Sequence, residues 1–433
     1  MRQSERSSRV RPARSSSRSP EAALVAVLAI AASIRGIFND FVYDDIPIIR
    51  DNARLHGFDI VRVREIFSHA YWPPPFVEQL YRPLTVVGLA AQYAVGAGSP
   101  MAFRLVSYAL YAATAVLVYR LATRVLDPWP SLGIAALFAV HPVHVEAVAL
   151  GVNQAELLVG LIALVMTASY IDWRRAGTIR GRSWALLAVL YTLATLVKES
   201  GFVLPLFLVA ADVTILRSNE SRWPGRADVF GYALLAMVAA ASLALRFAVA
   251  GPAAFAVVPA AELRGLDVVG RIGVMLHVVP MWLRLLVWPR HLQVDFAPGE
   301  IVSGGALEAA FGALLLLGLV GAIGYALRRD RVLAFGLLWM AIALLPVSNL
   351  LPTGVVLAER TLFLPSVGFV LAVGAVTQRA LEEPAMSPTW RRLALGGVCA
   401  LLLALGLLRS VGRQAVWNSQ HVTINSASSR RAP

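Results

Sequence analysis

Two adjacent acidic residues, Asp44 and Asp45, are the first candidates for chemistry in this sequence. They follow Phe41, Val42 and Tyr43, just beyond the first long apolar run. A carboxylate at the mouth of a membrane helix can serve as a general base or as a metal ligand. The same two acids in a loop exposed to water would only add solubility, and the residues alone leave both interpretations open.

Two histidines and a glutamate form a second polar group at the end of the third apolar run. His141 and His144 are three residues apart, a spacing that puts both side chains on one face of a helix, and Glu146 follows them. A metal site is conceivable, but the spacing matches no standard zinc signature. We expect a hydrogen-bonding cluster that lines a cavity, with a purely structural network as the alternative.

Three cations next to apolar runs are candidates for binding phosphate. Arg82 stands between an aromatic residue and a proline, Lys198 precedes Glu199, and Arg360 follows Glu359. Lys198 is the only lysine of the chain, and a lysine acts as a compact charge for phosphate. The alternatives are that Arg82 reaches out to lipid headgroups and that Lys198 pairs with Glu199.

The overall composition indicates how these residues are held. Of the 433 residues, 58% are apolar and 15% are charged, and the mean hydropathy is +0.67. A soluble domain has about half apolar and a quarter charged residues, so a water-soluble enzyme is excluded. The net charge of +13 does not indicate nucleic acid, because the cations are distributed between apolar runs as in membrane proteins. Cys399 is the only cysteine, which excludes a disulfide scaffold.

Eleven apolar runs are close to the length of about 20 residues that a helix needs to cross a bilayer. A twelfth apolar stretch, residues 268–289, contains Arg271, His277, Pro280 and Arg284, and we expect it to be a re-entrant or interfacial helix. The eleven runs are residues 22–38, 103–123, 131–150, 153–171, 183–198, 200–216, 229–250, 303–327, 333–351, 360–378 and 393–412.

The arginines predict the direction of these helices. Residues 1–20 form a serine- and arginine-rich tail that we expect to be disordered and cytoplasmic. Every loop on the same side then carries at least two arginines, provided that 268–289 does not cross. The membrane domain spans 21–412, with two larger outer loops at 39–102 and 251–302 and a short outer tail at 413–433. All three groups of polar residues described above fall on the outer side. As an alternative, the first run is a cleaved signal peptide.

Five strings of residues, in this order, resemble the TMTC-type protein O-mannosyltransferases, which are members of the GT-C superfamily of membrane glycosyltransferases. The resemblance covers about residues 35 to 420. It implies an all-α, polytopic, GT-C-like fold, a catalytic acid in the first outer loop and a polyprenyl-phosphate-linked sugar as donor. The strings are Phe41-Val42-Tyr43-Asp44-Asp45, Tyr81-Arg82-Pro83-Leu84-Thr85, His141-Pro142-Val143-His144-Val145-Glu146-Ala147-Val148, Lys198-Glu199 and Ala358-Glu359-Arg360.

The resemblance implies that a sugar, mannose, is transferred with inversion to the serine or threonine hydroxyl of a secreted or periplasmic protein. Asp44 is then the base and Asp45 its partner, or the two are exchanged. Arg82, Lys198 and Arg360 bind the donor phosphate. His141, His144, Glu146, Glu199 and Glu359 line the substrate pocket.

The partners expected are therefore the lipid bilayer, the lipid-linked donor and a protein acceptor, without nucleic acid. No cofactor is implied, and a dependence on a divalent metal is an open alternative. The arginine- and alanine-rich composition is typical of a bacterial protein, which indicates the inner membrane with the site on the periplasmic side.

One departure from the family and one competing class of protein leave other functions open. The tetratricopeptide repeats that the family carries after its last helix are absent from this sequence, so a glycan or lipid acceptor is an alternative to protein. A transporter or flippase for a lipid-linked sugar would share the topology. Such proteins usually contain matching halves with broken helices, and none is visible here.

Overall fold

The computed structural model describes residues 20–76, 80–217, 225–251, 259–296, 298–301, 305–351, 353–383 and 387–419. Within these ranges the chain forms helices and no strand. The basic tail expected at 1–20 lies outside the described residues except for Pro20, and so does the part of the expected outer tail beyond residue 419.

Each of the eleven apolar runs contains a helix, which confirms an all-α, polytopic membrane protein. These helices are α1 (Pro20–Ser33), α4 (Pro100–Ala122), α5 (Pro128–Ala139), α7 (Gln154–Arg175), α8 (Gly181–Val197), α9 (Leu204–Val213), α10 (Arg226–Ala250), α13 (Gly305–Arg329), α14 (Arg331–Leu344), α15 (Phe363–Glu382) and α16 (Pro388–Arg413). The remaining α-helices are α2 (Ile60–Ser68), α3 (Pro83–Val95), α6 (Val145–Ala149), α11 (Val268–Val287) and α12 (Pro298–Ile301).

The number of crossings stays a prediction. Among the described residues, seven helices are long and apolar enough to span a membrane, or eight if α5 and the bent segment after it count as one. Helix α11 belongs to the seven by length and composition, although the arginines of the inner loops led us to expect a re-entrant or interfacial helix on the outer side. Helices such as α9 are shorter than a full crossing.

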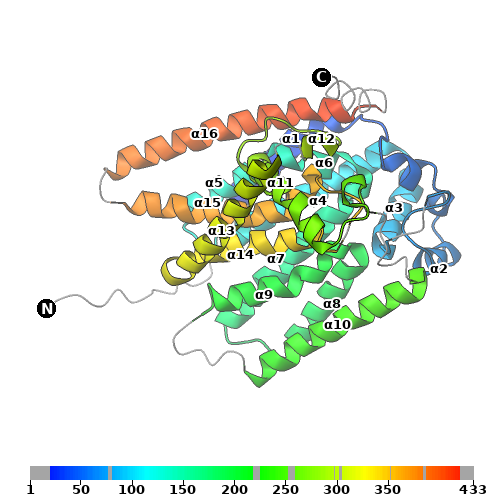
Figure 1. The fold of residues 1–433 in the computed structure, drawn as a ribbon, viewed down its shortest axis with the longest axis horizontal. Helices are drawn as coiled ribbons and strands as arrows, with labels where there is room; N and C mark the ends of the chain where they lie inside the picture. Colours follow the sequence, from blue (N-terminus) through cyan, green and yellow to red (C-terminus); the bar gives the residue numbers. More distant parts are fainter. Residues whose placement is uncertain are drawn as a thin grey trace.

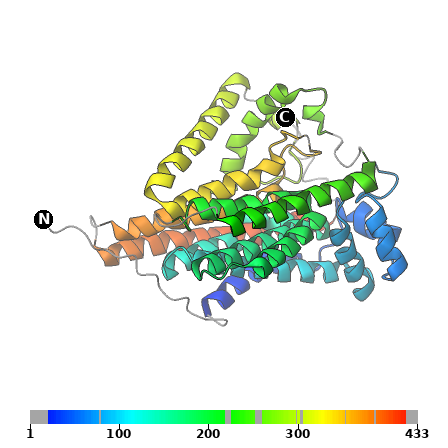
Figure 2. The same ribbon diagram turned by 90° about the horizontal axis from the view of Figure 1, so that it is seen from below.

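The long helices run along the longest dimension of the molecule, and α2 and α3 gather at one end of it (Figure 1). Seen from below, α13 stands away from the main layer of helices (Figure 2). Helices α13 and α16 leave many leucines exposed, such as Leu317 at 69% and Leu408 at 71%. Exposed apolar faces of this kind suit contact with lipid.

Glycines allow α14 and α15 to pack with their backbones in contact. A Cβ atom on Gly368 would lie 2.5 Å from the carbonyl oxygen of Gly336, and one on Gly336 would lie 2.8 Å from the carbonyl oxygen of Gly368. Small residues at such a crossing are typical of membrane helices, which gain packing contacts when they approach closely. This contact positions α15, and Arg360 lies in the 3₁₀ turn Glu359–Leu362 directly before that helix.

The first outer loop is anchored to the helix ends by its own apolar residues. Phe41, Val42 and Ile49 are buried in one cluster together with Phe103 of α4 and Val152 before α7. Burial of these side chains fixes the segment that carries Asp44 and Asp45 against the ends of two long helices.

The third apolar run is broken, although a continuous helix was expected over 131–150. Helix α5 ends at Ala139, a 3₁₀ turn covers Pro142–His144, and the next helical segment is bent by 44°. The cause is Pro142, whose ring and missing N–H are incompatible with a helix interior. His141 and His144 therefore do not share the face of one helix.

Candidate functional site

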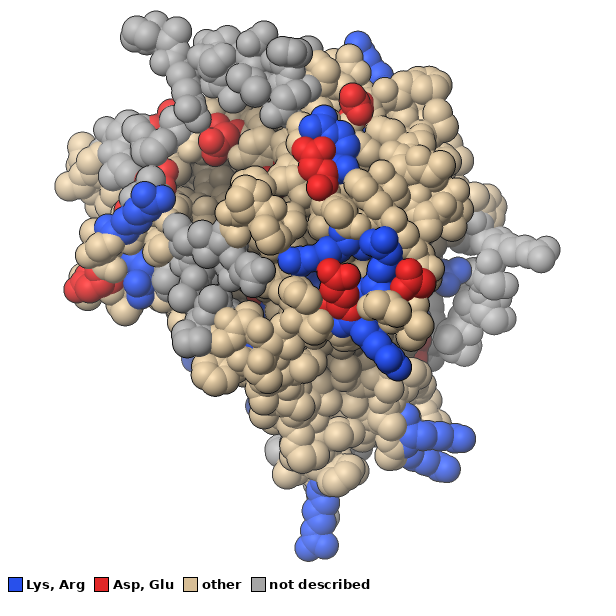
Figure 3. All heavy atoms as spheres, turned by 90° about the vertical axis from the view of Figure 1, so that its right-hand side faces the viewer, with Lys and Arg blue, Asp and Glu red and all other residues tan. Residues whose placement is uncertain are grey.

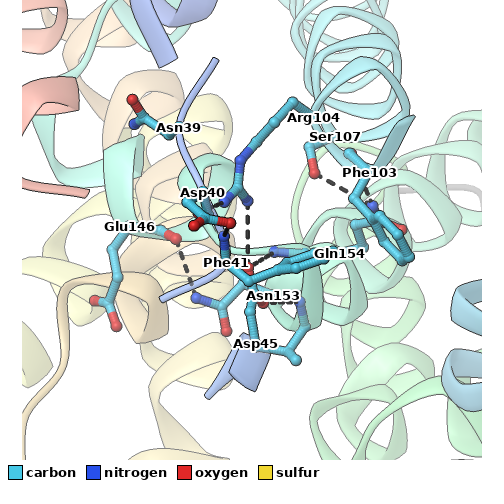
Figure 4. A network of polar contacts seen from close by, with 12 residues as sticks. Asn39, Asp40, Phe41, Asp45, Phe103, Arg104, Ser107, Glu146, Asn153 and Gln154 are labelled. Carbon is cyan, nitrogen blue, oxygen red and sulfur yellow. Dashed lines mark hydrogen bonds and ion pairs between the residues drawn. The ribbon is translucent and has the colours of Figure 1, made fainter. Parts of the chain in front are cut away.

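The carboxylate of Asp45 is buried, and both of its oxygens have hydrogen-bonding partners. Its carboxylate accepts hydrogen bonds from the backbone N–H groups of Gly151 and Val152, at 3.0 and 2.9 Å, and Arg104 Nη1 lies 3.3 Å from it. Arg104 also donates to the carbonyl oxygen of Asp40 (Figure 4). Because Asp45 is completely buried, an acceptor cannot reach it without displacing these partners.

Asp44 faces a different environment from its neighbour. The turn before it has Tyr43 at φ 53°, in the left-handed region that residues other than glycine rarely adopt. Asp44 is half-buried, and its carboxylate forms no hydrogen bond or ion pair within the described part of the chain. The carboxylate of Asp45 is thus satisfied, whereas that of Asp44 is available and directly follows a residue with a strained backbone.

Four charged groups act on Asp44. Burial raises the pKa of the Asp44 carboxyl above its ordinary value, and the negative charges of Asp45 and Glu146 raise it further. The positive charges of Arg360 and Arg82 oppose this rise. A carboxylate with a raised pKa is a better proton acceptor than an ordinary aspartate, which fits a general base.

Arg360 is held beside Asp44 by Glu146. The guanidinium of Arg360 pairs with Glu146 Oε1, and the backbone N–H of Arg360 donates to Glu146 Oε2 at 2.8 Å. Asn153 in turn donates to the backbone carbonyl of Glu146 at 3.0 Å. Two of the predicted site residues, far apart in the sequence, are thereby brought together.

Arg82 is positioned by Glu199, another predicted site residue. Arg82 Nη2 lies 2.6 Å from Glu199 Oε2, and its guanidinium lies over the ring of Tyr71 at 4.9 Å. Arg246 reaches the other oxygen of Glu199 at 2.9 Å. Burial favours the neutral form of Glu199, but the two arginines outweigh it and hold the pKa of Glu199 at about 2.

Lys198 does not pair with its neighbour Glu199. Its Nζ lies 2.5 Å from Glu156 Oε1 at the beginning of α7. Each of the three predicted phosphate-binding cations is therefore matched with a glutamate. Charged groups of both signs lie close together at the end of the molecule where α2 and α3 lie (Figure 3).

The two histidines have separate structural partners. His141 Nε2 is 2.9 Å from the carbonyl oxygen of Leu286. His144 is buried, with Nε2 at 2.8 Å from Ser366 Oγ and Nδ1 at 3.0 Å from Tyr111 Oη. Both rings fasten the broken helix to its surroundings, and their place in a substrate pocket stays a prediction.

Glu359 is completely buried and has a different partner from Arg360. It pairs with Arg413 at the end of α16, at 3.3 Å. No group of three or more His, Cys, Asp or Glu side chains suited to a metal ion occurs in the described ranges.

Arg104 and Arg246 were not among the site residues predicted from the sequence. Both lie within apolar runs that were predicted to cross the membrane, where an ionisable residue is costly unless it is paired or functional. That rule could have found them, and it would have predicted buried carboxylate partners, here Asp45 and Glu199.

The fold and the site thus define a multi-pass helical membrane protein in which the carboxylate of Asp44 is available among ion-paired arginines. No family model matches the chain. It is similar to protein O-mannosyl-transferase TMTC3 of Homo sapiens, with 27% identity over 94% of this chain and 47% of that protein. It is also similar to protein O-mannosyl-transferase TMTC4 of Mus musculus, with 29% identity over 93% of this chain and 60% of that protein.

A shorter match has higher identity. The protein O-mannosyl-transferase Tmtc2 of Drosophila melanogaster is 33% identical over 43% of this chain and 21% of that protein. These similarities confirm the resemblance to the TMTC-type proteins, and a GT-C relationship is consistent with them. The chain spans about half the length of its TMTC3 relatives.

Proposed function

We propose that this chain is a membrane glycosyltransferase that moves mannose from a polyprenyl-phosphate donor to a serine or threonine hydroxyl of a secreted or periplasmic protein. The observation that carries the proposal is Asp44, an available carboxylate of raised pKa on which the charges of Arg82 and Arg360 act. The names of the relatives support mannose and a protein acceptor. The donor class follows from the GT-C resemblance.

Asp44 removes the proton from the acceptor hydroxyl in the proposed reaction. The hydroxyl oxygen forms a bond to the anomeric carbon while the bond from that carbon to the phosphate oxygen breaks. The electron pair of the broken bond stays on the phosphate, and this single displacement inverts the anomeric centre. Phosphate is a good leaving group, so the scheme needs no general acid.

The cations stabilise the negative charge that develops on the departing phosphate. Arg82 and Arg360 are the two whose charges act on Asp44, and Lys198 completes the set. Their glutamate partners support them by fixing the side chains before the substrate arrives, since preorganised charges need no rearrangement in the transition state. Asp45 acts as a positioning residue that fixes the turn.

The orientation belongs to the same proposal. Residues 21–412 form the catalytic membrane domain in the bacterial inner membrane, with a cytoplasmic N-terminus and the site facing the periplasm. The basic loops on the opposite side support this orientation.

The test follows label from radioactive polyprenyl-phosphate-mannose in membranes that contain the protein. The wild type should label a protease-sensitive fraction, and Asp44→Asn should lower turnover by about 10²–10⁴-fold, because it removes the base. Asp51→Asn is the matched control, since Asp51 lies in the same loop, is exposed and pairs with Arg50 on the surface. Label in lipid or polysaccharide would change the acceptor, and lack of transfer with several donor sugars would contradict the proposal.

A further inference from the structure

A large apolar pocket lies apart from the carboxylate site. Its volume is about 590 Å³, within the range of about 300–1,000 Å³ that is typical of ligand sites. Asp44, Arg82, Lys198 and Arg360 do not line it. Its apolar walls come from four helices, α5, α11, α15 and α16, and include Leu137, Leu286, Val370, Val373, Leu402 and Leu405.

Three cationic or titratable side chains stand together at this pocket. Arg290 and His291 follow the end of α11, and Arg409 lies near the end of α16. All three are exposed, and none forms an ion pair with a carboxylate of the described ranges. Arg409 Nη2 donates to the backbone carbonyl of Arg290 at 2.6 Å, which holds the two arginines side by side.

The segment that carries Arg290 and His291 is fixed by the residues after them. Leu292 and Phe296 are buried in one apolar cluster, and Val294 is buried in the cluster that contains Phe41. The cations are therefore held at the pocket by a packed segment. Unlike Arg82, Lys198 and Arg360, they form no ion pair with a glutamate of the described ranges. The charge of Arg409 acts on the buried Glu359, but the ion-pair partner of Glu359 is Arg413.

We propose that this pocket binds an anionic phospholipid of the outer leaflet, with an acyl chain between α5, α15 and α16 and the phosphate on Arg290 and Arg409. The pocket is lined by the outer halves of these helices in the predicted topology, so its cations stand at the level of the phospholipid headgroups. Arginines near that level attract anionic lipids.

The donor lipid is a less suitable occupant. Its phosphate is bonded to the sugar carbon that reacts, so it must lie beside the base, among the cations that act on Asp44. The ring of His141, the one candidate site residue that lines the pocket, is already engaged by Leu286 and by the N–H of Val143. The cations at the pocket therefore suit a second phosphate group.

The test measures lipid binding to the purified full-length chain by native mass spectrometry, with phosphatidylglycerol and with phosphatidylcholine of the same acyl chains. Phosphatidylglycerol should bind in preference. Each of Arg290→Gln and Arg409→Gln should weaken its binding about fivefold, and the double variant about 30-fold, from about 1 kcal/mol per arginine near the membrane surface. Arg392→Gln, an exposed arginine at the other end of α16, should leave it unchanged.

A second pair of variants tests the apolar part independently of charge. Leu405→Trp fills the pocket and should reduce binding of phosphatidylglycerol, whereas Leu401→Trp, on the same helix but outside the pocket, should not. Thermal unfolding of each variant verifies that it is folded. Equal binding of the two phospholipids, or equal effects of variant and control, would overturn the proposal. Displacement of phosphatidylglycerol by polyprenyl phosphate would also overturn it and assign the pocket to the donor. None of these results depends on sugar transfer.

Discussion

Replacing Asp45 by asparagine should destabilise the fold, whereas the same change at Asp44 should not. Asp45→Asn leaves the charge of Arg104 buried without its counter-ion, since both side chains are almost completely inaccessible. Removing one partner of a buried ion pair costs about 3–5 kcal/mol. The amide also replaces one of the two oxygens that accept from Gly151 and Val152 with a donor. This loss is a large part of a total stability of about 5–15 kcal/mol.

For Asp44→Asn we expect no loss in the free energy of unfolding. The raised pKa of Asp44 means that folding disfavours its ionised form, so the carboxylate reduces stability near neutral pH. An uncharged amide at this position should leave the free energy of unfolding unchanged or raise it. The turnover loss described above would then occur in a folded protein.

The assay is thermal or denaturant unfolding of the purified variants in detergent, together with sugar transfer. Arg104→Gln and the double variant Asp45→Asn/Arg104→Gln complete a mutant cycle. The double variant should lose less stability than the sum of the single variants, because no charge remains unpaired. If Asp45→Asn kept the stability of the wild type and lost turnover, the roles that we assign to the two aspartates would be refuted.

Three further predictions concern pH, packing and metal. Turnover should fall as the pH drops through the raised pKa of Asp44, above the ordinary aspartate value of 3.8. The residual activity of Arg360→Gln should fall at a higher pH than that of the wild type, because Arg360 lowers this pKa. An unchanged pH profile in the variant would show that Arg360 does not act on Asp44. Gly368→Ala should cost about 1–3 kcal/mol of stability in thermal unfolding, since its methyl group meets the backbone of α14, whereas Gly397→Ala, with open space around it, should cost nothing through steric contact. Transfer should persist in EDTA, and its loss with recovery on adding a divalent cation would support the metal-dependent alternative.

The helices could be predicted from the sequence because each depends on a local property. Apolar runs specify where a helix forms, and all eleven contain one. The break after Ala139 was the exception, although Pro142 was visible in the sequence. The length of the surrounding apolar run obscured a backbone effect that a single residue causes.

Five residues of the ion-paired cluster were named from the sequence, but their pairings were not predictable: Arg82, Glu146, Lys198, Glu199 and Arg360. Arg360 and Glu146 are 214 residues apart, and Arg82 and Glu199 are 117 apart. Which carboxylate meets which guanidinium depends on how the helices pack, and the spacing of residues does not contain that information. For the same reason the sequence could not distinguish Asp44 from Asp45. Only the burial of Asp45 against Arg104 separates them.

The position of Asp44 close to the predicted phosphate-binding cations determines how sugar transfer responds to the membrane potential. In the proposed reaction Asp44 becomes neutral as the leaving phosphate gains a negative charge, so charge moves between neighbouring groups at one end of the molecule. A charge that crossed the whole bilayer would contribute about 2.3 kcal/mol per 100 mV of membrane potential. Sugar transfer should therefore be insensitive to voltage and generate no current. A transporter that carried the charged donor across the membrane would respond to the voltage and would generate a current.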